Sequence, residues 1–99
     1  MLLATPHQYA AMLDAAAEGG YAYAAINVTS SETLNAALRG FTLANADGIV
    51  QISVGGAAYL SGAALRDAWL GARAFACYAQ VIAESARTIR RHCRSRPVW

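Results

Sequence analysis

The sequence contains no lysine, so every fixed positive side-chain charge is an arginine. Three Arg and six acidic residues lie in residues 1–84, whereas five Arg and no acidic residue lie in residues 85–99. These segments carry net charges of −3 and +5, which give the formal charge of +2. An arginine-rich tail can bind nucleic acid or an anionic membrane surface. We expect neither partner here, because the tail has another explanation, given below.

Cysteine is almost absent as well. Cys77 and Cys93 are too few for a disulfide framework, and no CxxC pair or Cys/His cluster has the spacing of a zinc site. The adjacent His92 and Cys93 offer only two ligands, whereas structural zinc takes four. We therefore expect a reduced, cytoplasmic chain without a metal site of its own. Cys77, among Ala, Phe and Tyr, is predicted to be a small buried hydrophobe.

We also expect no targeting or membrane-spanning segment in this sequence. The N-terminus has no basic region of the kind that opens a signal peptide. Residues 48–65 carry no charge, but they include Gln51, two serines and four glycines. This composition predicts a strand, a turn and a loop rather than a transmembrane helix. We expect no membrane partner.

The apolar content is high but consists largely of alanine. Hydrophobic residues make up 57% of the 99 residues. Alanine favours helices yet buries little area per residue. A chain of this length forms at most one small domain, so we expect a small core.

The first predicted element is a helix over residues 6–18. Thr5 is a suitable N-cap, and Pro6 occupies the first helical position, where a missing N–H costs nothing. Gly19 and Gly20 can end the helix in a left-handed conformation. Its apolar face comprises Tyr9, Met12, Leu13 and Ala16.

A strand over residues 21–28 and a second helix follow. The strand is a short apolar run between the two glycines and a Thr-Ser-Ser cluster. Thr29 and Glu32 fit a capping box that starts the helix. The apolar face of this helix, which fades near residues 45–47, comprises Leu34, Ala37, Leu38 and Phe41.

The last predicted elements are a strand over residues 48–54 and a long helix from about Ala64. One side of this helix carries Leu65, Trp69, Ala72, Ala76, Ala79 and Ala83. Strands that alternate with helices indicate parallel βα units. Both strands are apolar on both faces, as in a buried parallel sheet. Two such strands alone do not form a stable sheet, so we expect them to belong to a larger one.

Three segments make the sequence identifiable: ATPHQYAAML, YAYAAINVTSSETLNAALRGF and DGIVQISVGGAAYLSG. They closely resemble the opening of zinc-dependent, class II fructose-bisphosphate aldolases of the actinobacterial type. The resemblance covers residues 1–86. It implies an α/β fold, namely the N-terminal portion of a (β/α)8 barrel with a capping helix and the first two βα units.

The resemblance also implies an activity and two substrate-binding residues. The family cleaves fructose 1,6-bisphosphate reversibly into glycerone phosphate and glyceraldehyde 3-phosphate, in glycolysis and gluconeogenesis, as a homo-oligomer that uses zinc. Ser53 matches a serine that contacts the glyceraldehyde 3-phosphate end of this sugar-phosphate substrate, and Asn27 matches an asparagine that orients it. From the residues alone, Ser53 could equally end a strand and Asn27 could bond the following turn.

The sequence departs from the family pattern after residue 86. The family's third strand reads approximately YPVxVALHTDHC, with the catalytic acid/base Asp and a zinc-ligand His, whereas residues 87–99 read RTIRRHCRSRPVW. We therefore expect a partial barrel over residues 1–86, a non-family tail over residues 87–99, no catalytic residue or zinc ligand, and no activity alone. A shifted reading frame could explain the tail: with suitable codons for residues 88–94, the frame one base later reads Arg-Tyr-Ala-Val-Thr-Val.

Two alternatives remain open. The chain could be a small, non-enzymatic helical module whose Arg-rich tail binds an acidic partner, which would require it to fold alone. It could also be completed by a separately encoded remainder of the barrel.

Overall fold

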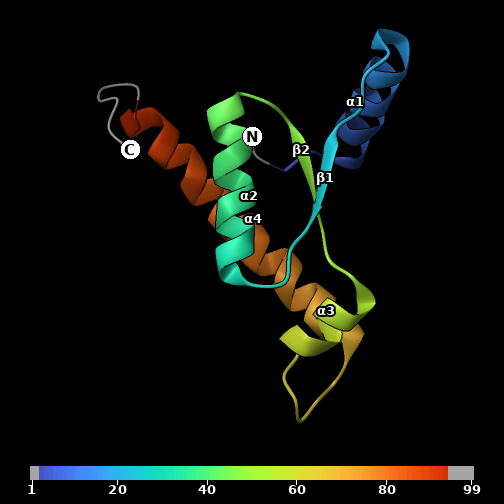
Figure 1. The fold of residues 1–99 in the computed structure, drawn as a ribbon, viewed down its shortest axis with the longest axis vertical. Helices are drawn as coiled ribbons and strands as arrows, with labels where there is room; N and C mark the ends of the chain where they lie inside the picture. The colour runs from blue at the N-terminus through green and yellow to red at the C-terminus, as the bar shows by residue number, and fades with distance from the viewer. Residues whose placement is uncertain (1–2, 94–99) are drawn as a thin grey trace.

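The computed structural model describes the backbone of residues 3–93 and the burial of side chains up to residue 85. The elements are α1 (Pro6–Gly19), β1 (Ala24–Asn27), α2 (Ser31–Ala44), β2 (Gly48–Gln51), α3 (Val54–Leu60) and α4 (Ala68–Cys93) (Figure 1). The α/β class and the alternation of the first four elements agree with the prediction. Both strands are shorter than expected, and α3 replaces part of the predicted loop.

Helix α1 begins at Pro6, as the sequence predicts, and ends at Gly19, one residue later than predicted. The Thr5 hydroxyl accepts a hydrogen bond from the Gln8 N–H, and the Gln8 side chain accepts one from the Thr5 N–H. Gly20 closes the helix with φ of 68°, a left-handed conformation that suits glycine. Of the predicted apolar face, Ala16 is buried, whereas Tyr9 and Leu13 are each 44% exposed. The face is thus only partly covered by the described residues.

The cap of α2 lies one residue later than predicted. Ser30, not Thr29, is the N-cap, and its hydroxyl accepts from the Thr33 N–H at 3.1 Å. The Thr33 hydroxyl oxygen accepts from the Ser30 N–H at 2.9 Å, which is the role assigned to Glu32. The Thr33 hydroxyl also accepts from the Thr29 N–H. One threonine therefore closes the whole turn, and Glu32 is not needed for it.

Strands β1 and β2 pair in parallel, with Ala24 opposite Gly48 and Asn27 opposite Gln51. Helices α2 and α4 lie on one side of this two-stranded sheet (Figure 1). The core forms there from Val28, Leu34 and Ala37, against which Val50 and Phe75 pack. Leu34 is fully buried and Val28 is 1% exposed. The predicted inward face of the second helix is thereby confirmed.

Helix α3 corrects the prediction of a turn and loop after β2. The Ser53 hydroxyl caps it, and Ser61 lies at its C-terminal end. Helix α4 starts at Ala68 rather than Ala64 because the chain first passes through Gly62, with φ of 96°, and Arg66, with φ of 44°. Trp69 was expected on the apolar side of the last helix but is 73% exposed.

The core is small, as the alanine content predicts. Four of the six buried apolar residues are alanines, and the largest fully buried side chains are Leu34 and Val28. The Cα radius of gyration is 15.1 Å, compared with about 13 Å for a compact domain of 100 residues. Cys77 is exposed, so its predicted burial is wrong: it lies on a face of α4 that no described element covers.

Candidate functional site

The two predicted site residues lie at the same edge of the sheet. Asn27 is the last residue of β1 and pairs with Gln51, the last residue of β2. Ser53 follows two residues later, in extended backbone with φ of −76° and ψ of 161°. Since the strands run parallel, their carboxyl ends meet at one edge. The structure therefore brings both residues to that edge.

The alternation of side chains places both residues on the same face. Val50 and Ile52 line a cavity together with residues of α2 and α4, so they point toward the helices. Successive side chains of a strand point to opposite faces. Asn27, Gln51 and Ser53 therefore face away from α2 and α4, and all three are exposed. Gln51 is a further polar residue of this face, and the alternation in QIS would have identified it.

The Ser53 hydroxyl has a structural role. Its oxygen accepts a hydrogen bond from the Gly56 N–H at 3.0 Å, which caps α3. This bond fixes the oxygen while leaving the hydroxyl hydrogen available to donate. Capping alone is enough to explain a serine at this position. The alternative drawn from the sequence, that Ser53 ends a strand, described only part of this role. Ser53 also presents a donor, held in place, at the carboxyl edge of the sheet.

The Asn27 side chain is not used by the turn that follows it. That turn is closed by the Thr33 hydroxyl, which accepts from the N–H groups of Thr29 and Ser30. Among the residues whose side chains are described, none forms a hydrogen bond with the Asn27 amide. Its donors and acceptor are therefore available to a ligand, in contrast to the alternative interpretation that this amide bonds the turn.

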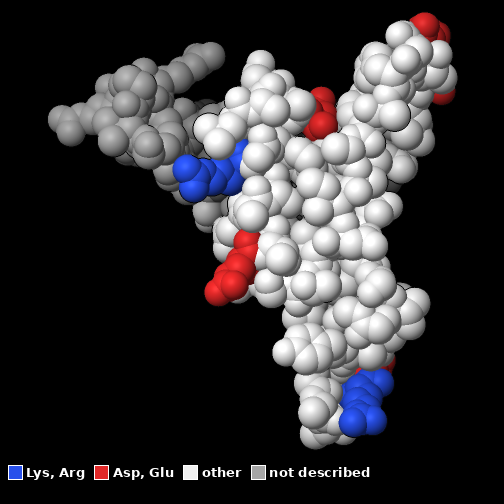
Figure 2. Space-filling view, viewed as in Figure 1, with Lys and Arg blue, Asp and Glu red and all other residues white. Residues whose placement is uncertain are grey.

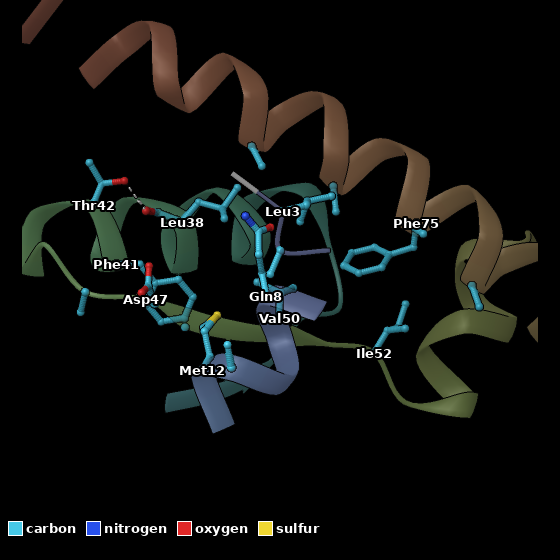
Figure 3. Close-up of a pocket in the computed structure, with 18 residues that line it drawn as sticks. Leu3, Gln8, Met12, Leu38, Phe41, Thr42, Asp47, Val50, Ile52 and Phe75 are labelled. Carbon is cyan, nitrogen blue, oxygen red and sulfur yellow. Dashed lines mark hydrogen bonds between the residues drawn. The ribbon is translucent and has the colours of Figure 1, made fainter. Parts of the chain in front are cut away.

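Asn27 and Ser53 do not line the cavity that the described residues form on the other face of the sheet. This cavity, of about 900 Å³, lies on the helix-covered face between α1, α2, β2 and α4. Figure 3 shows Met12, Phe41 and Val50 around it, with Asp47 as its charged member. A cavity without a basic group does not suit a sugar bisphosphate. It lies on the face opposite Asn27 and Ser53.

Charged and metal-binding groups are sparse in residues 3–85, whose side chains the structure describes. No group of three or more His, Cys, Asp or Glu in this part of the chain could hold a metal ion. Figure 2 shows the basic side chains of the visible face well apart from one another, so the described residues form no basic patch on that face. Over the same described span, no helix is both long enough and apolar enough to cross a membrane.

Comparisons with known proteins give one consistent result. The family model described as class-II fructose-bisphosphate aldolase matches residues 7–94. The chain is 60% identical over 84 residues to a fructose-bisphosphate aldolase of Streptomyces galbus, covering 85% of this chain and 25% of that protein. Aldolases of Streptomyces coelicolor and Corynebacterium glutamicum are 57% and 54% identical, with 85% and 86% of this chain covered. The chain spans about a quarter of the length of these relatives.

Proposed function

This chain belongs to the class II fructose-bisphosphate aldolase family, and we propose that it supplies the first two strands of a (β/α)8 barrel that cleaves fructose 1,6-bisphosphate into glycerone phosphate and glyceraldehyde 3-phosphate. The observation that carries this proposal is the placement of Asn27 and Ser53. They lie at the carboxyl ends of adjacent parallel strands, on the face that α2 and α4 leave free. Barrel enzymes build their active sites at this end of the strands.

The two residues have chemistry suited to a sugar phosphate. In the proposed site, the Ser53 O–H donates to a phosphate oxygen at the glyceraldehyde 3-phosphate end. A hydrogen bond to a charged oxygen is stronger than one between neutral groups. The Asn27 amide, which has no partner among the described side chains, orients the sugar through its donor and acceptor atoms. Both residues bind and position substrate, and neither moves a proton.

The family's metal, generally zinc, polarises the substrate carbonyl when it is bound. Residues 3–85 do not fit this metal, since the described side chains contain no three-ligand cluster. No step of the reaction is therefore assigned to a metal held by these residues, and we propose no catalytic residue among them. A cytoplasmic location and a homo-oligomeric state also follow from the family as proposals.

The chain alone is proposed to be inactive, because the family's acid/base Asp and zinc ligand belong to a strand that residues 87–99 do not match. The purified 99-residue chain should give no cleavage of fructose 1,6-bisphosphate, with or without added zinc. The measurement is a coupled assay of triose phosphate release. Turnover abolished by a chelator would contradict this part of the proposal.

A chimera tests whether the segment can work in a barrel. Residues 1–86 would replace the matching segment of the Streptomyces galbus aldolase, to which the chain is 60% identical over 84 residues. We expect chelator-sensitive cleavage of fructose 1,6-bisphosphate, with the unchanged relative as control. A chimera that folds, as circular dichroism would show, but does not cleave the substrate would overturn the proposal.

The origin of residues 87–99 is a separate proposal. We propose that a shifted reading frame produces the Arg-rich ending, and the family match, which extends to residue 94, does not test this. Sequencing the gene would decide: an adjacent frame should encode a strand with His and Asp. If no frame does, the idea is wrong, and a separately encoded remainder is the next candidate. The alternative of a small helical module whose Arg-rich tail binds an acidic partner is less well supported, because the chain contains the parallel strands β1 and β2 and matches the aldolase family.

A further inference from the structure

Helix α3 begins at Ser53 and has only seven residues, two of them glycine. Glycine is a poor helix former, and so short a helix is marginal without tertiary contacts. What holds α3 in place therefore also holds the Ser53 hydroxyl. Four hydrogen bonds and one close contact with the backbone of α4 do this.

The first turn of α3 is bonded directly to Ser53. The Ala57 N–H donates to the Ser53 carbonyl oxygen at 2.8 Å, and the Gly56 N–H donates to the Ser53 hydroxyl oxygen at 3.0 Å. A displacement of Ala57 or Gly56 would therefore change the position of the hydroxyl or break its hydrogen bond. Ala57 is 3% exposed, so it is packed rather than free to move.

Gly71, in the first turn of α4, packs against Ala57. An added Cβ at Gly71 would overlap the Ala57 carbonyl oxygen and lie 2.6 Å from the carbonyl carbon. Real Cβ atoms essentially never approach another heavy atom so closely, so any side chain at this position would push α3 and α4 apart. Gly71 itself is buried.

A second link fixes the other end of α3. The Ser61 hydroxyl donates to the Ala58 carbonyl oxygen at 2.7 Å and accepts from the Asp67 N–H at 2.8 Å. Asp67 in turn caps α4, because its carboxylate accepts from the Leu70 N–H at 3.1 Å. The loop between the helices is thus closed at both ends, and this link acts together with the Gly71 contact to hold α3 against α4.

We propose that Gly71 is a positioning residue for Ser53: its missing side chain lets α4 pack on the Ala57 carbonyl, which fixes the first turn of α3 and the hydroxyl that meets the substrate phosphate. The last part of this inference rests on the proposed function. The first part, the mechanical link from Gly71 to the Ser53 cap, does not.

The mechanical link is tested by amide hydrogen exchange in the full 99-residue chain. Gly71→Ala should speed exchange of the Gly56 and Ala57 amides by roughly twofold to tenfold, the range expected when one hydrogen bond is weakened. Ser53→Ala gives the reference value for a Gly56 amide without its cap. Gly40→Ala is the matched control, since no atom lies within 4 Å of a Cβ added there. Unchanged exchange in the Gly71→Ala chain would overturn the proposal.

The link to substrate is tested by a double-mutant cycle in the chimera. Gly71→Ala should raise the KM for fructose 1,6-bisphosphate between about fivefold and 100-fold with a smaller change in kcat, because small displacements of positioning groups cost this much. In the Ser53→Ala background, the same change should raise KM less than about twofold, since the hydroxyl is already gone. An equal KM effect in both backgrounds would contradict positioning through Ser53, because a purely structural role predicts that result.

Two outcomes separate this inference from the proposed function. If Ser53→Ala leaves KM unchanged, the proposed substrate contact is wrong, and the hydrogen-exchange result alone decides the mechanical link. If Gly71→Ala prevents folding, Ser61→Ala replaces it as a milder change, because it removes only the hydroxyl that joins the end of α3 to Asp67. It should speed Gly56 exchange in the same direction, and no change would overturn the proposal.

Discussion

The two faces of the β1–β2 sheet are covered in different ways. On one face, Val28 and Val50 pack in one cluster with Leu34 of α2 and Phe75 of α4. Residues of this chain therefore cover that face. On the other face, Asn27, Gln51 and Ser53 are exposed, and no described element packs over them. The helix-covered face is where folding stability originates. The free face carries the polar groups, and we assign function to it.

The largest expected effect tests the helix-covered face. Leu34 is fully buried, so Leu34→Ala should lower the free energy of unfolding by about 2–5 kcal/mol. Leu43→Ala is the matched control on the same helix, because Leu43 is 63% exposed, and it should change stability by less than about 0.5 kcal/mol. Denaturant unfolding of the full chain measures both. Equal effects would mean that this face is not the core.

A second prediction concerns the turn between β1 and α2. Ser30→Ala removes the acceptor of the Thr33 N–H and should cost about 1 kcal/mol, the usual value for a lost N-cap. Thr29→Ala leaves that bond intact and should cost less than half as much. The same unfolding experiment compares them. If Thr29→Ala were the more costly change, Thr29 rather than Ser30 would be the cap of α2.

The free face should tolerate changes that the core does not. The Asn27 side chain is exposed and has no hydrogen bond to a described side chain, so Asn27→Ala should alter the free energy of unfolding by less than about 0.5 kcal/mol. A loss of 2 kcal/mol or more would mean that Asn27 belongs to the core. The contrast between the two faces would then disappear.

The smallest effect concerns alkaline stability at the amino ends of the strands. The Tyr23 hydroxyl donates to the Met12 carbonyl oxygen at 3.2 Å. A side-chain hydrogen bond with Tyr21 raises the pKa of Tyr23 above its usual value of 10.0, and burial and the Tyr21 and Asp47 charges act in the same direction. The resulting stabilisation is complete below the unfolded pKa and is lost as pH rises through the folded one.

Tyr23→Phe should therefore flatten the fall in stability above pH 10.0, the ordinary pKa of this group. The measurement is thermal unfolding of both chains across this pH range. An identical pH dependence in the two chains would show that Tyr23 is not the group responsible.

The sequence predicted the parts of the fold that local chemistry determines. The Thr5 cap, the Gly20 stop and the inward position of Leu34 follow from neighbouring residues, and the structure confirms them. In TSSET, three adjacent hydroxyl residues offer competing caps, and side-chain chemistry alone does not choose among them. The backbone conformation selects the cap. Ser30 has an extended backbone, with φ of −154°, and its hydroxyl caps the helix.

Helix α3 could not be predicted because its stability is not local. Its two glycines disfavour a helix, yet the Ser53 cap and the contact of Ala57 with Gly71 stabilise one. The candidate site was partly predictable, since the pattern of two parallel strands brings their carboxyl ends together. The common face of Gln51 and Ser53 follows from strand alternation, but placing Asn27 on the same face required the strand register, which only the structure provides.

The most direct test of the account is the kinetics of the chimera with changes on the free face. We predict that Ser53→Ala raises the KM for fructose 1,6-bisphosphate by roughly tenfold to 100-fold, as expected for losing a hydrogen bond to a charged group, and that Asn27→Ala also raises it. Leu43→Ala, on the exposed side of α2, should leave KM unchanged. If both free-face variants kept the KM of the chimera, these strand ends would not meet the substrate, and the assignment of function to this face would be wrong.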